Sequence, residues 1–139
     1  MQQCKPILLV EDDNIDVMVF KRLLSDMKVL NPLVELNDGE KALEYLRSEG
    51  NERPCMILLD LNMPKMTGIE FLKTAKGEYI LKKIPVIMLT TSKDDQDVVE
   101  SFKLGAGGYV VKPVDIEKFL NATRLINLYW ALSEPQNEV

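Results

Sequence analysis

The stretch PILLVED at residues 6–12 decides how this chain folds. An apolar run of this kind, ended at once by two acidic residues, is typical of a short strand that is buried on both faces of a parallel sheet. Because parallel sheets bind ligands at the carboxyl ends of their strands, Glu11 and Asp12 stand where a site would form. Three later runs have the same form and also end on polar residues: Met56 to Leu59 before Asp60, Pro85 to Leu89 before Thr90, and Tyr109 to Val111 before Lys112 and Pro113.

Helical segments separate these runs and give five strand-then-helix units over the 139 residues, with Leu33 to Leu36 as the remaining short strand. This alternation predicts an α/β fold, a flavodoxin-like doubly wound (βα)5 sandwich with a parallel five-stranded sheet of order 2-1-3-4-5. We expect a single domain over residues 1–139, with a core over about residues 5–132 and a flexible C-terminal tail over about residues 133–139.

Capping residues indicate where the helices begin. Asp13 or Asn14 is expected to cap the first helix, Asp38 to open the second, Ser92 to cap the fourth and Asp115 the fifth. The third is expected from about residue 69, after a loop that contains Pro64. Apolar residues fall at helical spacing within these segments: Ile15, Val19, Phe20, Leu23, Leu24 and Met27; Ala42, Leu43 and Leu46; Phe71 and Leu72; and Ile116, Phe119, Leu120, Ile126, Tyr129 and Trp130, with the last helix expected to reach about Leu132.

Charge and composition exclude several classes of function. A net charge of −5 argues against a direct nucleic-acid partner, which would require a basic face. The chain has no apolar stretch long enough to cross a bilayer and no signal-peptide pattern, so we expect no membrane partner and a cytoplasmic location. It also contains no histidine, which excludes histidine-dependent catalytic triads, histidine metal ligation and a role as a phosphohistidine carrier.

The acidic residues predict a metal site. Strand order 2-1-3-4-5 places the first and third strands side by side, so Glu11, Asp12 and Asp60 are expected to converge. Crowded carboxylates raise one another's pKa, and a hard divalent cation relieves that repulsion most directly, so we expect Mg²⁺, or Mn²⁺ in its place. Such a cation accepts phosphate oxygens, which favours phosphoryl transfer with Asp60 as the nucleophile. Lys112 would then pair with the phosphoryl oxygens, and Thr90 would donate a hydrogen bond to one of them.

Four motifs together resemble the receiver domain of two-component response regulators: ILLVEDD at residues 7–13, LLDLNMPKMTG at 58–68, PVIMLTTS at 85–92 and GAGGYVVKPVD at 105–115. They match in order and spacing, and the resemblance covers essentially the whole chain. It implies that Glu11, Asp12, Asp60 and the backbone carbonyl of Asn62 bind the metal, and that Asp60 is the residue that becomes phosphorylated.

The same resemblance implies a switch. Thr90 matches the switch hydroxyl, Tyr109 the aromatic switch position and Lys112 the lysine of the site, with a cis bond between Lys112 and Pro113. A kinase's phosphohistidine would supply the phosphoryl group, and slow self-catalysed hydrolysis would remove it, so no enzymatic turnover of other substrates is expected. Movement of Thr90 and Tyr109 would change the binding preference of the face formed by the fourth helix, fifth strand and fifth helix.

The partners follow from the resemblance. A sensor histidine kinase is the expected phosphodonor, and a downstream protein or phosphotransfer partner is the expected output, because the chain shows no second domain. The TTS after the fourth strand, the KPVD before the last helix and the LYWAL at residues 128–132 resemble the single-domain regulators paired with cyanobacterial phytochrome kinases. That subgroup implies a phytochrome kinase and a homodimer through the last-helix face, and the late Tyr129 and Trp130 are also compatible with an association surface.

Some residues depart from the pattern of the family. Thr67 and Thr91 differ from residues common in the family, and Ser92 lies where the family tunes hydrolysis, so the lifetime of the phosphorylated state is open.

A haloacid-dehalogenase-type phosphatase would need a second acid where this chain has Asn62. A pseudo-receiver that only binds partners is disfavoured by the intact set of site residues, and a flavin carrier by the acidic turn after the first strand.

Overall fold

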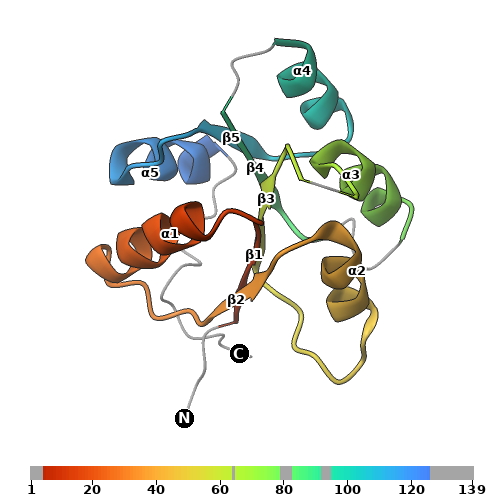
Figure 1. The fold of residues 1–139 in the computed structure, drawn as a ribbon, viewed down its shortest axis with the longest axis horizontal. Coiled ribbons are helices and arrows are strands. Elements are labelled where there is room, and N and C mark those ends of the chain that lie inside the picture. Colours follow the sequence, from red (N-terminus) through yellow and green to blue (C-terminus); the bar gives the residue numbers. More distant parts are fainter. Residues whose placement is uncertain (1–4, 64, 79–82, 92–94, 126–139) are drawn as a thin grey trace.

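Five strands and five helices alternate along the part of the chain that the computed structural model describes, which comprises residues 5–63, 65–78, 83–91 and 95–125 (Figure 1). The strands are β1 (Ile7–Val10), β2 (Leu33–Leu36), β3 (Met56–Asp60), β4 (Val86–Thr90) and β5 (Gly108–Val111). The helices are α1 (Asn14–Asp26), α2 (Gly39–Arg47), α3 (Gly68–Lys76), α4 (Asp95–Lys103) and α5 (Ile116–Leu125).

The strands form one parallel sheet of order β2-β1-β3-β4-β5, which confirms the predicted topology. The order reverses between β1 and β3, where Val10 pairs with Leu59. Glu11 and Asp60 are the next residues along these two strands, so the register brings both side chains to the same edge of the sheet.

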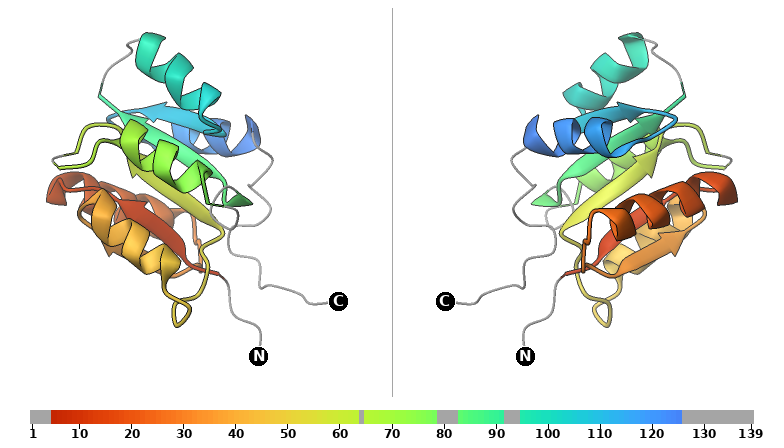
Figure 2. Two further views of the ribbon diagram at one scale, coloured as in Figure 1. Left: turned by 90° about the vertical axis from the view of Figure 1, so that its right-hand side faces the viewer. Right: turned by 90° about the vertical axis from the view of Figure 1, so that its left-hand side faces the viewer.

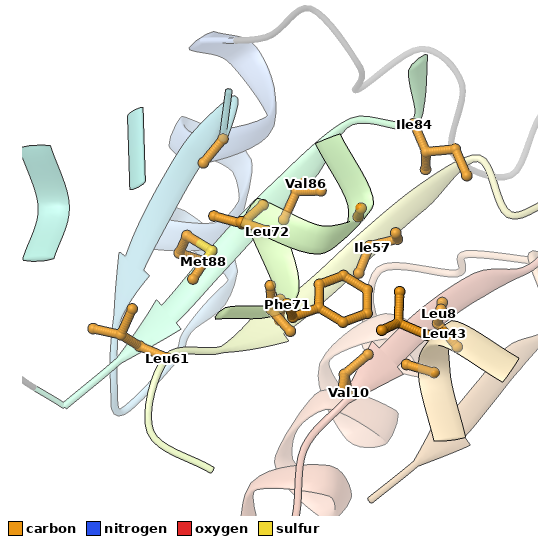
Figure 3. Packing of buried hydrophobic residues seen from close by; sticks show 14 of the residues in the cluster. Leu8, Val10, Leu43, Ile57, Leu61, Phe71, Leu72, Ile84, Val86 and Met88 are labelled. Carbon is orange, nitrogen blue, oxygen red and sulfur yellow. The ribbon is translucent and has the colours of Figure 1, made fainter. Parts of the chain in front are cut away.

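The helices cover both faces of the sheet, with α1 and α5 on one side and α2, α3 and α4 on the other (Figures 1 and 2). Alternate residues of β1 point to opposite faces, so Ile7 and Leu9 pack beneath α1 and α5 while Leu8 and Val10 pack beneath α2 and α3. Figure 3 shows the second of these cores, built around the fully buried Phe71. Burial on both faces holds the strand ends in fixed positions.

The predicted helix starts are confirmed where the structure describes them. Asp13 accepts a hydrogen bond from the Ile15 amide at 2.8 Å, Asp38 from the Lys41 amide at 2.8 Å, and Asp115 from the Lys118 amide at 2.8 Å. Helix α3 begins one residue earlier than expected, and Thr67 is its N-cap. Ser92 lies outside the described residues, as do Ile126, Tyr129, Trp130, Leu132 and the predicted tail.

The apolar face of α1 differs from the one that spacing suggested. Ile15 and Val19 are 71% and 37% exposed, whereas Val17 is buried beside Phe20 and the two leucines that follow it. The helix is rotated so that the Phe20 ring meets Phe119 of α5 edge to face, at 6.1 Å between centroids. At the start of α5, Ile116 is likewise 40% exposed.

None of the helices in the described part of the chain combines the length and apolar character that a bilayer crossing requires.

Candidate functional site

Three carboxylates meet where β1 and β3 end. Glu11, Asp12 and Asp60 each offer an oxygen atom, and these atoms lie within 4.8 Å of one another. Glu11 and Asp60 are buried, whereas Asp12 is exposed, so the cluster opens to solvent on one side. Carboxylate oxygens are the ligands that Mg²⁺ and Mn²⁺ prefer, and this donor set fits such a cation.

Lys112 reaches this cluster from the end of β5. Its Nζ atom donates hydrogen bonds to Glu11 Oε1 at 2.7 Å and to Asp16 Oδ2 at 2.8 Å, and it lies 3.4 Å from Asp60 Oδ1. The Lys112 side chain is only 9% exposed. One buried ammonium therefore lies within ion-pair distance of three carboxylates, one of which is the predicted phosphoryl acceptor.

Asp16 is a residue of the site that the sequence patterns do not predict. It lies in the first turn of α1, and its carboxylate is 26% exposed. An acid in the first turn of a helix is commonly explained by the helix dipole alone, and no local pattern connects it to a lysine 96 positions later. The signal that was available is its place: one turn into the helix that follows the acidic strand end.

The electrostatics of Glu11 and Lys112 are opposed. Burial raises the pKa of Glu11 to about 7; Lys112 counteracts this, while the neighbouring Asp60 adds to it. Burial alone would lower the pKa of Lys112, but its hydrogen bonds to Asp16 and Glu11 and the charge of Asp60 outweigh burial and raise it. The lysine is thus a permanent cation, while Glu11 is a carboxylate that holds a proton readily.

The loop after Asp60 folds back onto the end of β3. The Asn62 amide lies 3.3 Å from Asp60 Oδ1, and the Gly68 amide donates to the Leu61 carbonyl at 2.9 Å. Thr67 and Glu70 form a reciprocal capping box at the start of α3. Thr67, which differs from the residue common in the family, therefore caps the start of α3. The Asn62 amide in the loop helps to orient the Asp60 side chain.

The predicted switch residues lie on β4 and β5. Thr90 is buried at the end of β4, and its carbonyl accepts a hydrogen bond from the Lys112 amide at 2.7 Å. Tyr109 is 39% exposed, and its ring meets Phe102 of α4 edge to face at 6.1 Å between centroids. The bond between Lys112 and Pro113 is cis, in agreement with the resemblance. Thr91 is exposed next to the site.

Comparison with known proteins places these features in context. Residues 7–124 match the model of the response regulator receiver domain. The chain is 36% identical to the response regulator Rcp1 of Synechocystis over 130 residues, which cover 91% of this chain and 88% of that protein. It is also 36% identical to the chemotaxis protein CheY of Pseudomonas aeruginosa over 107 residues, which cover 77% of this chain and 83% of that protein.

Solved structures of response regulators are similar to this structure. The bacteriophytochrome response regulator RtBRR superposes with a TM-score of 0.82 at 43% identity, covering 96% of this chain and 85% of that one. The Mn²⁺-bound form of Rcp1 gives a TM-score of 0.76 at 36% identity, covering 91% of this chain and 94% of that one. The phosphorylated cyanobacterial phytochrome response regulator RcpA gives 0.77 at 34% identity, covering 94% of this chain and 99% of that one.

Proposed function

Because the chain belongs to the response regulator receiver domain family, we propose that Asp60 is the residue at which this phospho-accepting response regulator takes up its phosphoryl group. The observation that carries the assignment is the convergence on Asp60: it belongs to the acidic cluster, and the Lys112 ammonium lies 3.4 Å from its Oδ1 atom. A cation held by the cluster and the Lys112 ammonium would together offset the negative charge of a phosphoryl group that is transferred to this carboxylate. The phosphodonor of such a receiver is a histidine kinase.

We propose Mg²⁺ as the metal, with Glu11, Asp12, Asp60 and the backbone carbonyl of Asn62 as its ligands. The all-oxygen donor set supports a hard divalent cation, and a relative, Rcp1, has been solved in an Mn²⁺-bound form. When bound, the cation would neutralise the charge that gathers on the phosphoryl oxygens. Glu11 must give up its proton to become a ligand, and its pKa of about 7 makes that release possible at neutral pH.

The transfer step uses the side chains already described. An Asp60 carboxylate oxygen attacks phosphorus, and an O–P bond forms as the P–N bond to the kinase's histidine breaks. The imidazole leaves and keeps its electron pair, and Lys112 compensates the charge on the transferred group. Later attack by water breaks the O–P bond, which releases inorganic phosphate and restores the carboxylate. Self-phosphorylation and slow self-dephosphorylation are the only chemistry that we assign, without turnover of other substrates.

Thr90 and Tyr109 form the proposed switch. Thr90 lies at the end of β4 beside the Lys112 strand, where its hydroxyl could donate to a phosphoryl oxygen after a small movement. Tyr109 follows on β5 and is half-exposed against Phe102, so an inward turn of its ring would alter the surface of α4 and β5. Such a change would alter which downstream protein or phosphotransfer partner binds.

For partners we propose a phytochrome-type sensor kinase, supported by the similarity to RtBRR and to RcpA, which are named as phytochrome response regulators.

We further propose a cytoplasmic receiver that forms a single domain over residues 1–139 and dimerises through the face of its last helix. The Tyr129 and Trp130 side chains that would extend that face lie outside the described residues. The net charge of −5 supports the absence of a nucleic-acid partner.

Intact mass after incubation with a small-molecule phosphodonor tests this assignment. The protein should gain one phosphoryl group in the presence of Mg²⁺ and none in its absence, and Asp60→Asn should gain none. Asp38→Asn is the matched control, since Asn caps a helix as well as Asp does, and this variant should be labelled like the wild type. Labelling of Asp60→Asn at the wild-type rate would refute the assignment, and turnover of many phosphate esters per protein would indicate a phosphatase.

A further inference from the structure

We propose that Asp16 is a positioning residue that holds the Lys112 ammonium beside Asp60 when the acidic cluster is occupied by metal. The inference rests on the proposed function and extends it to a residue outside the phosphoryl and metal sites. Three observations carry it: the short ion pair between the two side chains, the separation of Asp16 from the metal cluster, and the rigid attachment of the helix that bears it.

Asp16 and Lys112 form one of the two shortest contacts of the lysine. The Nζ atom lies 2.8 Å from Asp16 Oδ2 and 2.7 Å from Glu11 Oε1, but 3.4 Å from Asp60 Oδ1. An ammonium has three N–H donors, so two are used by these short hydrogen bonds and one remains for the Asp60 side. Asp16 therefore helps to fix the direction in which the remaining donor points.

The other two carboxylates around Lys112 have competing roles. Glu11 and Asp60 both belong to the acidic cluster that fits a divalent cation, and among the described residues that cluster does not include Asp16. A cation bound by Glu11 and Asp60 would withdraw electron density from the oxygens that now face Lys112. Asp16 is then the partner whose hydrogen bond to the lysine is left intact.

The position of Asp16 on α1 suits this role. Asp13 caps the helix and accepts from the Asp16 amide at 3.4 Å, so Asp16 lies within the capped first turn of α1. Val17 and Phe20, one and four residues further on, are buried, and Phe20 packs on Phe119 of α5. The Asp16 carboxylate is 26% exposed and lies in the first turn of α1, near the positive end of the helix dipole, where an acidic side chain is favourable.

Nuclear magnetic resonance of the lysine ammonium groups tests the contact directly, without phosphorylation. In the Mg²⁺-loaded wild type, the Lys112 ammonium should exchange slowly with water, because it is buried and held by the Asp16 carboxylate. In Asp16→Asn its signal should broaden or disappear, whereas Asp16→Glu should restore part of it. Asp26→Asn removes the same charge from the far end of the same helix and should leave the signal unchanged. A Lys112 signal that persists unchanged in Asp16→Asn would overturn the proposal.

A double-mutant cycle on the phosphorylation rate tests the function of the contact. Asp16→Asn should slow Mg²⁺-dependent phosphorylation roughly tenfold in the wild-type background, the order expected for a hydrogen bond between charged groups. In the Lys112→Met background the same substitution should slow it less than about twofold, because Asp16 acts through the lysine. Equal slowing in both backgrounds would mean that Asp16 acts on the metal or on folding instead, and would refute the positioning role.

The two experiments separate this inference from the assignment of Asp60. If the wild type does not become phosphorylated, the proposed function fails, while the resonance experiment still decides whether Asp16 holds Lys112. If the wild type is phosphorylated and Asp16→Asn leaves both the rate and the Lys112 signal unchanged, only the inference fails. Calorimetric titration with Mg²⁺ should give affinities within about threefold for Asp16→Asn and Asp26→Asn, since neither residue is a proposed ligand.

Discussion

The main chain of Gly68 lies directly against that of Asp60. A Cβ atom at Gly68 would stand 2.7 Å from the Asp60 carbonyl oxygen and 2.9 Å from Leu61 Cα. Both neighbours are backbone atoms at the end of a buried central strand, so neither can move without moving the strand end itself. The start of α3 and the proposed phosphoryl acceptor are thereby locked together.

Gly68→Ala should therefore impair both folding and phosphorylation. We expect a loss of about 1–3 kcal/mol in the free energy of unfolding, because overpacking against rigid atoms forces a backbone shift. Gly77→Ala is the matched control: at Gly77, which ends α3, the nearest atom to an added Cβ is 3.5 Å away and φ is −74°, so stability should be unchanged or slightly higher. Urea denaturation and phosphorylation rates measure both effects, and equal stability of the two variants would contradict the close approach.

Thr67 should matter for α3 more than for the chemistry. Its hydroxyl accepts from the Glu70 amide at 3.2 Å, and its own amide donates to the Glu70 carboxylate at 3.0 Å. Thr67→Ala should lower the free energy of unfolding by about 1 kcal/mol, whereas Thr67→Asp should be nearly neutral because Asp is an equally good N-cap. Thermal denaturation of the two variants provides the comparison, and a neutral Thr67→Ala would show that the cap contributes nothing.

The raised pKa of Glu11 predicts a pH-dependent metal affinity. The pKa of Glu11 is about 7, so below that pH a bound cation must displace a proton. The affinity for Mg²⁺ should rise up to tenfold per pH unit below about pH 7 and level off above it. Because the chain has no histidine, few other groups titrate in this range. Calorimetry from pH 5.5 to 8.5 would measure the slope, and Glu11→Gln should bind more weakly with no such slope.

The same group affects the stability of the metal-free protein in the opposite direction. The pKa of Glu11 is higher in the folded protein than its ordinary value of 4.5, so the folded state binds more protons between these two values. The contribution of Glu11 to stability is complete below about pH 4.5 and is lost as the pH rises through 7. Metal-free wild type should lose more stability than Glu11→Gln between pH 5 and 8; parallel curves would argue against the raised pKa.

Phe102 should hold the Tyr109 ring in the position that it takes when Asp60 is unphosphorylated. The two rings meet edge to face at 6.1 Å, a contact worth about 0.5–1.5 kcal/mol beyond its buried area. If Tyr109 turns inward on phosphorylation, Phe102→Ala should destabilise the unphosphorylated protein by that order and the phosphorylated protein by less. Val99→Ala, on the same helix at a residue 50% exposed, is the control and should change both states by only a few tenths of a kcal/mol. Equal destabilisation of the two phosphorylation states by Phe102→Ala would show that Tyr109 keeps its place.

Much of the fold and of the candidate site could be predicted because it depends on local patterns. The apolar run before Glu11 and the one before Asp60 each mark a buried strand, and a parallel sheet brings their ends together whatever the helices do. The caps at Asp13, Asp38 and Asp115 are equally local, since each satisfies amides within its own first turn. The cis bond before Pro113 was expected only through family resemblance.

Other features depend on contacts between distant segments and could not be predicted. The rotation of α1 that buries Val17 and exposes Ile15 is set by how Phe20 meets Phe119 of α5, which no window of sequence contains. The pairing of Asp16 with Lys112 likewise joins residues 96 positions apart. A helical repeat gives the spacing of apolar residues, while the direction in which each side chain points is decided by the neighbouring helix.

The ion pair between Glu11 and Lys112 joins residues that are 101 positions apart in the sequence. The site is therefore completed late in the synthesis of the chain. In a growing chain on the ribosome, Glu11, Asp12 and Asp60 would emerge long before Lys112. The acidic cluster would therefore lack the Lys112 ammonium until almost the entire sheet could assemble. Unfolding of β5 alone would have the same effect. If Lys112 is required for phosphorylation as proposed, chains that have not yet formed β5 should not accept a phosphoryl group from the kinase.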